Sequence, residues 1–397
     1  MPTRKQTIAG AVVVIVAGAA AIALVTRTSS HTASRAAGKL SHVTTPWSVS
    51  TPPVAKPATC TPMHAGQADI DAAPPNTTFC LSGVHNWTLI PKTGDRLFGP
   101  AVLDGEHTTV DAIEPGTATG VTLSELEIRN YAPGNQRSAI ETDKGAAGWT
   151  LRNLQVHDNG TAAGGAGVSV GPGWTVQGGR YYNNRQLGLS GAVSDGAVID
   201  GAEIDHNNFK DDTYNDRNVS CGYEAGGFKW TADNVTVANS FVHDNACVGL
   251  WMDANARGAI IRDNHVVDNW DEGILIEIST GATVTGNTVT LNGFKSFRGK
   301  CGNLWVFGAG IVLSESDGST IAHNTVDGNC NGITGAQETR HEAHPGLLRN
   351  DSVHDNVISG SGRSGFGTKN GAALSKRNLA FTGNTLSHGM TFCALRC

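Results

Sequence analysis

The sequence contains little charge and few aromatic side chains. Charged residues make up 16% and aromatic residues 6% of its 397 residues, whereas a charged share of about 25% is usual in soluble domains. This scarcity argues against coiled coils and long solvated helices, which need many charged side chains. The net charge is -6, so the chain has no overall basic field that would attract nucleic acid. We therefore expect no nucleic-acid partner.

The N-terminal 25 residues predict export. Arg4 and Lys5 precede an unbroken run of apolar or small residues at 8–25, which is long enough to span the hydrocarbon of a membrane. A cleaved signal peptide and an uncleaved anchor both fit this run, and either one places the rest of the chain outside the cytoplasmic membrane, secreted or at the cell surface. Residues 26–59 predict a disordered linker of Thr, Ser, Ala and Pro. We expect a monomer that meets a membrane only through its N-terminal segment.

Eight cysteines follow the export segment. An even number of cysteines in an exported chain predicts disulfides, and the CxxC-type spacing of zinc sites is absent. Spacing alone does not determine the connectivity, so we take neighbours in the sequence as the expected partners. The predicted pairs are Cys60–Cys80, Cys221–Cys247, Cys301–Cys330 and Cys393–Cys397.

A short phrase recurs along the chain: an asparagine, a few β-branched residues and a second asparagine. Copies begin at Asn239, Asn264, Asn287 and Asn324. The first two steps are 25 and 23 residues, one turn of a solenoid, and the longer third step indicates an insertion at residues 294–307. The period is too short for a propeller blade, which needs about 40–45 residues.

Short segments rich in Val, Ile and Thr, bounded by Gly and Asn, predict strands within each repeat. The expected fold is therefore all-β: a right-handed parallel β-helix over residues 60–397, with disulfides that stabilise its ends. The recurrent asparagines fit either left-handed turns or a ladder of stacked amides. Both roles are structural, so we assign these asparagines no catalytic role.

The chain resembles the secreted right-handed parallel β-helix repeat proteins of actinobacteria, in the pectate-lyase-like superfamily. The resemblance runs from about Pro74 to the C-terminus. It rests on PPNTTFCLSGVHNWTLIPKTGDRLFG (74–99), EAGGFKW (224–230), GLWMD (249–253) and GILIEIS (273–279). The resemblance implies the fold and export, with residues 74–99 as an N-terminal cap.

Three charged residues fall at nearly the same place in successive repeats. Lys229, Asp253 and Glu277 lie 10 or 11 residues before the asparagine that begins the next phrase. Side chains alternate along a strand, so Leu250 and Met252 should point inward and the three charged residues outward. Coils stack about 4.8 Å apart. The expectation is a solvent-facing row in which the two carboxyl groups are separated by about one coil rise.

Two carboxyl groups about 5–5.5 Å apart are what a retaining glycosidase needs. The pattern W-x-D followed by E also resembles the paired motif of the β-helical β-xylosidases of glycoside hydrolase family 120, which implies Asp253 as nucleophile and Glu277 as general acid/base. Lys229 would hold a substrate hydroxyl or carboxylate, and Trp251 would offer a flat surface for a sugar ring. The other expected substrate contacts are Glu224, Trp270 and Asp271.

Other functions fit the same residues. A polysaccharide lyase or uronan epimerase would use Lys229 as base, with Asp253, Glu277 and Glu224 as ligands of Ca²⁺. A non-catalytic carbohydrate-binding surface protein would need only the rod and its linker, with the carboxylates solvated on an exterior ladder. We favour hydrolysis of a polysaccharide or oligosaccharide without a cofactor, and Ca²⁺ belongs only to the lyase alternative.

Overall fold

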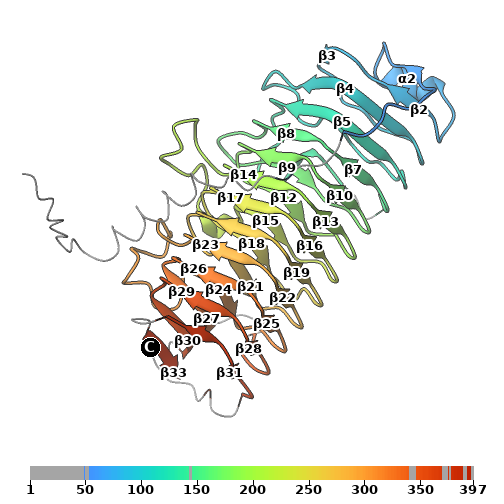
Figure 1. Ribbon diagram of the computed structural model, residues 1–397. Helices are drawn as coiled ribbons and strands as arrows, with labels where there is room; N and C mark the ends of the chain where they lie inside the picture. Colours follow the sequence, from blue (N-terminus) through green and yellow to red (C-terminus); the bar gives the residue numbers. More distant parts are fainter. Residues whose placement is uncertain are drawn as a thin grey trace, which may run out of the picture.

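The computed structural model describes residues 49, 53–142, 145–338, 346–368, 374 and 377–387, and the backbone of 391–394. Within them the chain winds into a parallel β-helix, an elongated rod of stacked coils (Figure 1). Each full coil contributes two short strands to one sheet and one strand to a second sheet. The predicted all-β fold is confirmed.

One stack of strands forms a ten-stranded parallel sheet, which carries the candidate site. Its strands are β6 (Ser138–Ile140), β9 (Ala166–Ser169), β12 (Leu187–Gly191), β15 (Gly226–Trp230), β18 (Val248–Met252), β21 (Ile274–Glu277), β24 (Ala309–Ser314), β27 (Asn331–Gln337), β30 (Arg363–Thr368) and β33 (Thr391–Ala394).

Two further stacks join through long strands at the N-terminal end into a 23-stranded sheet. The strands of that end are β1 (Thr61–Pro62), β2 (Thr78–Cys80), β3 (Val84–His85), β4 (Arg96–Asp104) and β5 (Thr122–Arg129). One stack continues with β7 (Thr150–Arg152), β10 (Thr175–Gln177), β13 (Val198–Asp200), β16 (Thr236–Ala238), β19 (Ile260–Arg262), β22 (Thr283–Thr285), β25 (Thr320–Ala322), β28 (Ser352–His354) and β31 (Ala380–Thr382). The other continues with β8 (Gln155–His157), β11 (Arg180–Tyr182), β14 (Glu203–Asp205), β17 (Phe241–His243), β20 (His265–Val267), β23 (Thr288–Thr290), β26 (Thr325–Asp327), β29 (Val357–Ser359) and β32 (Thr385–Leu386).

A short helix, α2 (Gln67–Ala72), covers the N-terminal end of the rod (Figure 1). Its Ile70 is fully buried in the core of the first coils. Residues 74–99, expected as the cap, form β2, β3 and the start of β4. Covering the end of a stacked core keeps its apolar side chains and open strand edges from water.

The core follows the alternation expected from the sequence. Leu250 and Met252 of β18 are fully buried, and so are Phe228 and Trp230 of β15. Large rings also stack from coil to coil: Trp149 and Trp174 lie 4.8 Å apart and nearly parallel. The inward and outward faces of these strands are therefore as predicted.

The recurrent asparagines form two buried amide ladders, because each Nδ2 donates to the Oδ1 of the asparagine one coil further on, at 2.8–3.1 Å. One ladder contains Asn264, Asn287, Asn324, Asn356 and Asn384. The other contains Asn159, Asn184, Asn207, Asn245, Asn269, Asn292 and Asn329. Asn239 is an exception: it has a left-handed backbone, with φ 51, and Ser240 takes the place before Asn264.

Three predicted disulfides are confirmed: Cys60–Cys80, Cys221–Cys247 and Cys301–Cys330. The side chains of Cys393 and Cys397 lie outside the described residues, so that pair stays a prediction. Each confirmed bridge joins a loop to a neighbouring coil, which limits how far that loop can move from the rod.

The expected export segment, residues 8–25, and most of the expected linker lie outside the described residues. In the part of the chain that the structure describes, no helix is both long and apolar enough to cross a membrane. Near the end of the expected linker, the Val54 N–H donates to Glu125 Oε1 at 2.7 Å.

The insertion expected at residues 294–307 folds against the outer face of the ten-stranded sheet. Val306 and Phe307 pack with Leu275 of β21 and Val312 of β24, and all four are buried. These two strand residues point away from the core, so the insertion, and not the interior of the rod, excludes water from them.

Candidate active site

Lys229 is the centre of a group of ion pairs on the outer face of the ten-stranded sheet. Its ammonium lies 2.6 Å from Glu224 Oε1 and 2.8 Å from Asp253 Oδ2. It also lies 4.3 Å from the centre of the Trp251 ring, within the range of a cation–π contact. The Lys229 side chain is only 5% exposed. Its charge is therefore balanced by protein groups rather than by water.

The predicted column of Lys229, Asp253 and Glu277 is wrong for its first member. Lys229 pairs in register with residue 251, two residues before Asp253, and its long side chain spans the offset. The count failed because it started from Asn239, whereas Ser240 occupies the ladder position. Corners of unequal length between the sheets add to the drift in spacing.

Asp253 and Glu277 do lie side by side on neighbouring coils, as predicted. Met252 pairs with Ile276, and the two carboxyl residues come next in each chain segment. Their surroundings differ: Asp253 contacts the ammonium of Lys229, whereas Glu277 Oε2 accepts a hydrogen bond from the neutral Trp251 Nε1 at 2.9 Å. The expected row is not solvent-facing, since Glu277 is 4% exposed.

These side chains line one pocket of about 320 Å³. Phe297 and Arg298 of the insertion form part of its wall, and Arg298 stacks on the Phe307 ring at 3.8 Å. Glu272 and Glu338 complete the acidic lining. The sequence pointed to the insertion but not to its position, so these lining residues were not predicted as site residues.

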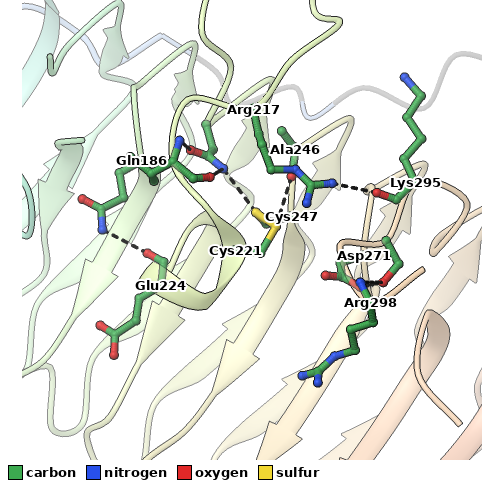
Figure 2. The surroundings of a disulfide bond; sticks show 12 residues. Gln186, Arg217, Cys221, Glu224, Ala246, Cys247, Asp271, Lys295 and Arg298 are labelled. Atoms are coloured by element: carbon green, nitrogen blue, oxygen red, sulfur yellow. Dashed lines mark hydrogen bonds between the residues drawn. A yellow bond between two sulfur atoms is a disulfide. The ribbon is translucent and has the colours of Figure 1, made fainter. Parts of the chain in front are cut away.

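Glu224 reaches the pocket from a loop that the Cys221–Cys247 disulfide ties to the next coil. It follows a single 3₁₀ turn, Cys221–Tyr223, and Figure 2 shows its carboxyl group extending from this loop away from the disulfide. Gly226, with φ 135, then starts β15; a Cβ there would lie 2.1 Å from a backbone oxygen of the next coil. The bridge and the glycine together bring Glu224 to Lys229.

Asp271 and Glu272 form a fully buried carboxyl pair at the turn before β21. Burial and the neighbouring Glu272 carboxyl raise the pKa of Asp271 well above its usual range. The Ser296 hydroxyl donates to Asp271 Oδ1 at 2.5 Å, and the Gly308 N–H donates to Glu272 Oε1 at 2.9 Å. Asp271 Oδ2 and Glu272 Oε2 have no hydrogen-bond partner among the described residues.

Two of the expected substrate contacts, Trp270 and Asp271, do not line the pocket, whereas Glu224 and Trp251 do. Trp270 packs under the Phe209 ring at 5.0 Å and beside the Lys295 ammonium at 4.2 Å. Trp251 is also more than a platform for a sugar, because Lys229 occupies one side of its ring and Glu277 its N–H.

A larger hollow of about 770 Å³ lies on the 23-stranded sheet, away from these residues. Its charged side chains pair with one another: Arg180 lies 3.4 Å from Glu203 and 2.7 Å from Asp205. Burial raises the pKa of Asp205, but hydrogen bonds from Arg180 and His206 outweigh it and lower that pKa to about 2. Asp205, His206 and His243 have the proximity of metal ligands, yet Arg180 binds both Asp205 oxygens. We assign this cluster a structural role.

The pocket residues do not fit the Ca²⁺ ion of the lyase alternative. The Lys229 ammonium already occupies the position between Glu224 and Asp253 that a shared metal would take. A dication there would meet the lysine charge at contact distance. Since both carboxylates hold Lys229, this side chain is also poorly placed to act as a free base.

The fold and this acidic pocket define a parallel β-helix with a covered site on one sheet. A family model described as "Right handed beta helix region" matches residues 138–306 and 200–342, which together span more than half of the chain. The chain therefore belongs to this family. No curated protein matches the sequence.

Solved structures share the fold at low sequence identity. A double mutant of the periplasmic alginate epimerase AlgG has a TM-score of 0.51 at 12% identity, and the match covers 78% of this chain and 73% of that one. The A-module of the mannuronan C-5 epimerase AlgE4 from Azotobacter vinelandii has a TM-score of 0.47 at 13% identity, with 83% of this chain and 94% of that one covered. At these identities the similarity establishes the fold, and the reaction has to be argued from the pocket.

Proposed function

We propose that the protein is a carbohydrate-active enzyme that hydrolyses glycosidic bonds with retention of configuration. The observation that carries this proposal is the pair Asp253 and Glu277, adjacent on neighbouring coils in one pocket but in unlike surroundings. Adjacent carboxyls with different environments are the arrangement in which one acts as nucleophile and the other as proton donor.

Asp253 is the nucleophile in this proposal. The Lys229 ammonium at 2.8 Å balances its negative charge, and the Ala254 N–H holds its other oxygen at 2.7 Å. Its carboxylate attacks the anomeric carbon and forms a glycosyl-enzyme ester. The pocket wall formed by the insertion keeps bulk water from competing with the sugar.

Glu277 is the general acid/base. Its environment is almost fully covered, and its partner Trp251 Nε1 is neutral, so the protonated carboxyl is less disfavoured here than in water. The acid gives its proton to the leaving oxygen in the first step. It then takes a proton from the water that hydrolyses the ester, which restores both carboxyl groups.

The full chain should be screened against oligosaccharides and aryl glycosides, with the anomeric configuration of the first product followed by NMR. Asp253→Asn should reduce turnover by at least about a thousandfold. Glu277→Gln should slow substrates with poor leaving groups far more than activated aryl glycosides, because the latter need no proton. Asp263→Asn, an exposed carboxyl outside the pocket, is the matched control and should leave turnover unchanged.

Products of inverted configuration, or near-native rates in both pocket variants, would reject this assignment. A lyase would instead release an unsaturated sugar that absorbs ultraviolet light, and its activity would depend on Ca²⁺. We expect no loss of activity in a chelator, because Lys229 holds the position between Glu224 and Asp253.

A further inference from the structure

The pocket lining is strongly acidic. Among the described residues it carries five carboxyl side chains against two cationic ones, which leaves an excess of three negative charges when all are ionised. The carboxyl residues are Glu224, Asp253, Glu272, Glu277 and Glu338, and the cations are Lys229 and Arg298.

Both cations already serve groups of the protein. The Lys229 ammonium is shared by Glu224 and Asp253. Arg298 Nε lies 3.9 Å from Glu272 Oε1, and the guanidinium stacks on the Phe307 ring. A substrate carboxylate that entered the pocket would therefore have to compete for a cation with these protein carboxylates.

Glu272 points to the kind of group that the pocket accepts. It lines the pocket and is fully buried. Its Oε1 accepts the Gly308 N–H, whereas its Oε2 has no hydrogen-bond partner among the described residues. A buried carboxylate oxygen needs a donor, which a sugar hydroxyl or an ammonium supplies and an ionised carboxylate does not.

We propose that the pocket binds a sugar unit that offers hydroxyl or amino donors and carries no carboxylate, and that it discriminates against uronic acids. This inference rests on the proposed function in one respect only, that the ligand is a carbohydrate. An uncompensated negative charge about 10 Å away in a partly buried site weakens the binding of an anion by roughly tenfold. The expected discrimination is thus tenfold or more.

The test is a direct binding measurement on the full chain in the presence of EDTA. A glycan array first identifies neutral, amino and uronate sugars that bind. Calorimetry then compares matched pairs, such as β-1,4-mannan and β-1,4-mannuronan oligosaccharides, or xylan oligosaccharides with and without glucuronate side groups. We expect the array to select neutral or amino sugars, and the neutral member of each binding pair to bind at least about tenfold more tightly.

Two variants connect the effect to the pocket. Glu272→Gln removes one charge while its amide oxygen can still accept the Gly308 N–H, and it should reduce the discrimination by about tenfold. Glu224→Gln tests the same point at a side chain that is 45% exposed, where folding is least at risk. Asp263→Asn removes an equal charge outside the pocket and should leave the ratio unchanged.

Uronates that bind as tightly as their neutral partners in EDTA would overturn this inference, and so would uronate binding that appears only with Ca²⁺. Selective binding of neutral or amino sugars without turnover would keep the inference and reject the proposed hydrolase. Turnover of a uronan would reject the inference alone, and failure of every glycan to bind would reject both.

Discussion

Lys229→Met removes the central charge of the site while keeping most of the aliphatic volume. The ammonium has two ion pairs, at 2.6 Å to Glu224 and 2.8 Å to Asp253. The Glu224 pair contributes little, about 0–1 kcal/mol, because that side chain is 45% exposed. The Asp253 carboxyl is 13% exposed, and leaving a largely buried carboxylate unpaired costs about 3–5 kcal/mol when burial is complete.

Allowing for this residual exposure and for a lost cation–π contact, we expect a loss of about 3 kcal/mol in the free energy of unfolding. The double variant Lys229→Met with Asp253→Asn should lose less than the two single variants together, by about 2 kcal/mol, because the neutral amide needs no counter-charge. The control is Arg257→Met, whose exposed pair with Asp233 should contribute about 0.5 kcal/mol or less.

Denaturant unfolding followed by circular dichroism measures these differences. Hydrogen exchange in β15 and β18 should accompany it, because coils of a solenoid can open locally. If Lys229→Met costs no more than Arg257→Met, or if the double variant shows simple additivity, the Lys229 pairs do not hold the site as we describe.

Two further predictions concern buried polar groups. Burial raises the pKa of Asp351 to about 8, so the folded state binds a proton that the unfolded state releases above about pH 4; stability should fall from about pH 4 to pH 8, and Asp351→Asn should remove this decline in pH-dependent thermal unfolding and raise stability by about 2–5 kcal/mol at pH 9. Asn287→Ala should cost about 2–4 kcal/mol in denaturant unfolding, because it leaves buried donors of Asn264 without an acceptor. Asn287→Ser should cost less, as Ser240 fills the equivalent place one coil away from Asn264. A flat pH profile of the native chain, or equal losses for Ala and Ser, would contradict these expectations.

The repeat itself was predictable because each of its parts depends on residues close in the sequence. Alternating side chains along β18 and β21 determine which residues enter the core. Asparagines two strands apart recur once per coil and therefore stack. Neighbouring cysteines meet because one coil brings them side by side, as Cys221 and Cys247 show.

The position of Lys229 could not be predicted in the same way. Corners of different length let strands stack in register while the spacing in the sequence drifts, so a count from Asn239 misplaced this residue by two positions. Asp253 and Glu277 were placed correctly because no insertion separates their strands.

The pocket depends on contacts between distant parts of the chain. Burial of Glu277 and the roles of Arg298 and Glu272 result from the insertion folding back over the sheet, and no local pattern specifies where a loop of irregular sequence packs. The sequence by itself thus determined the coil, its core and most of its bridges, since these repeat with the backbone period. Only the tertiary structure decided which outward charges become a covered site, because burial and charge pairing depend on what lies across the surface and not on what comes next in the chain.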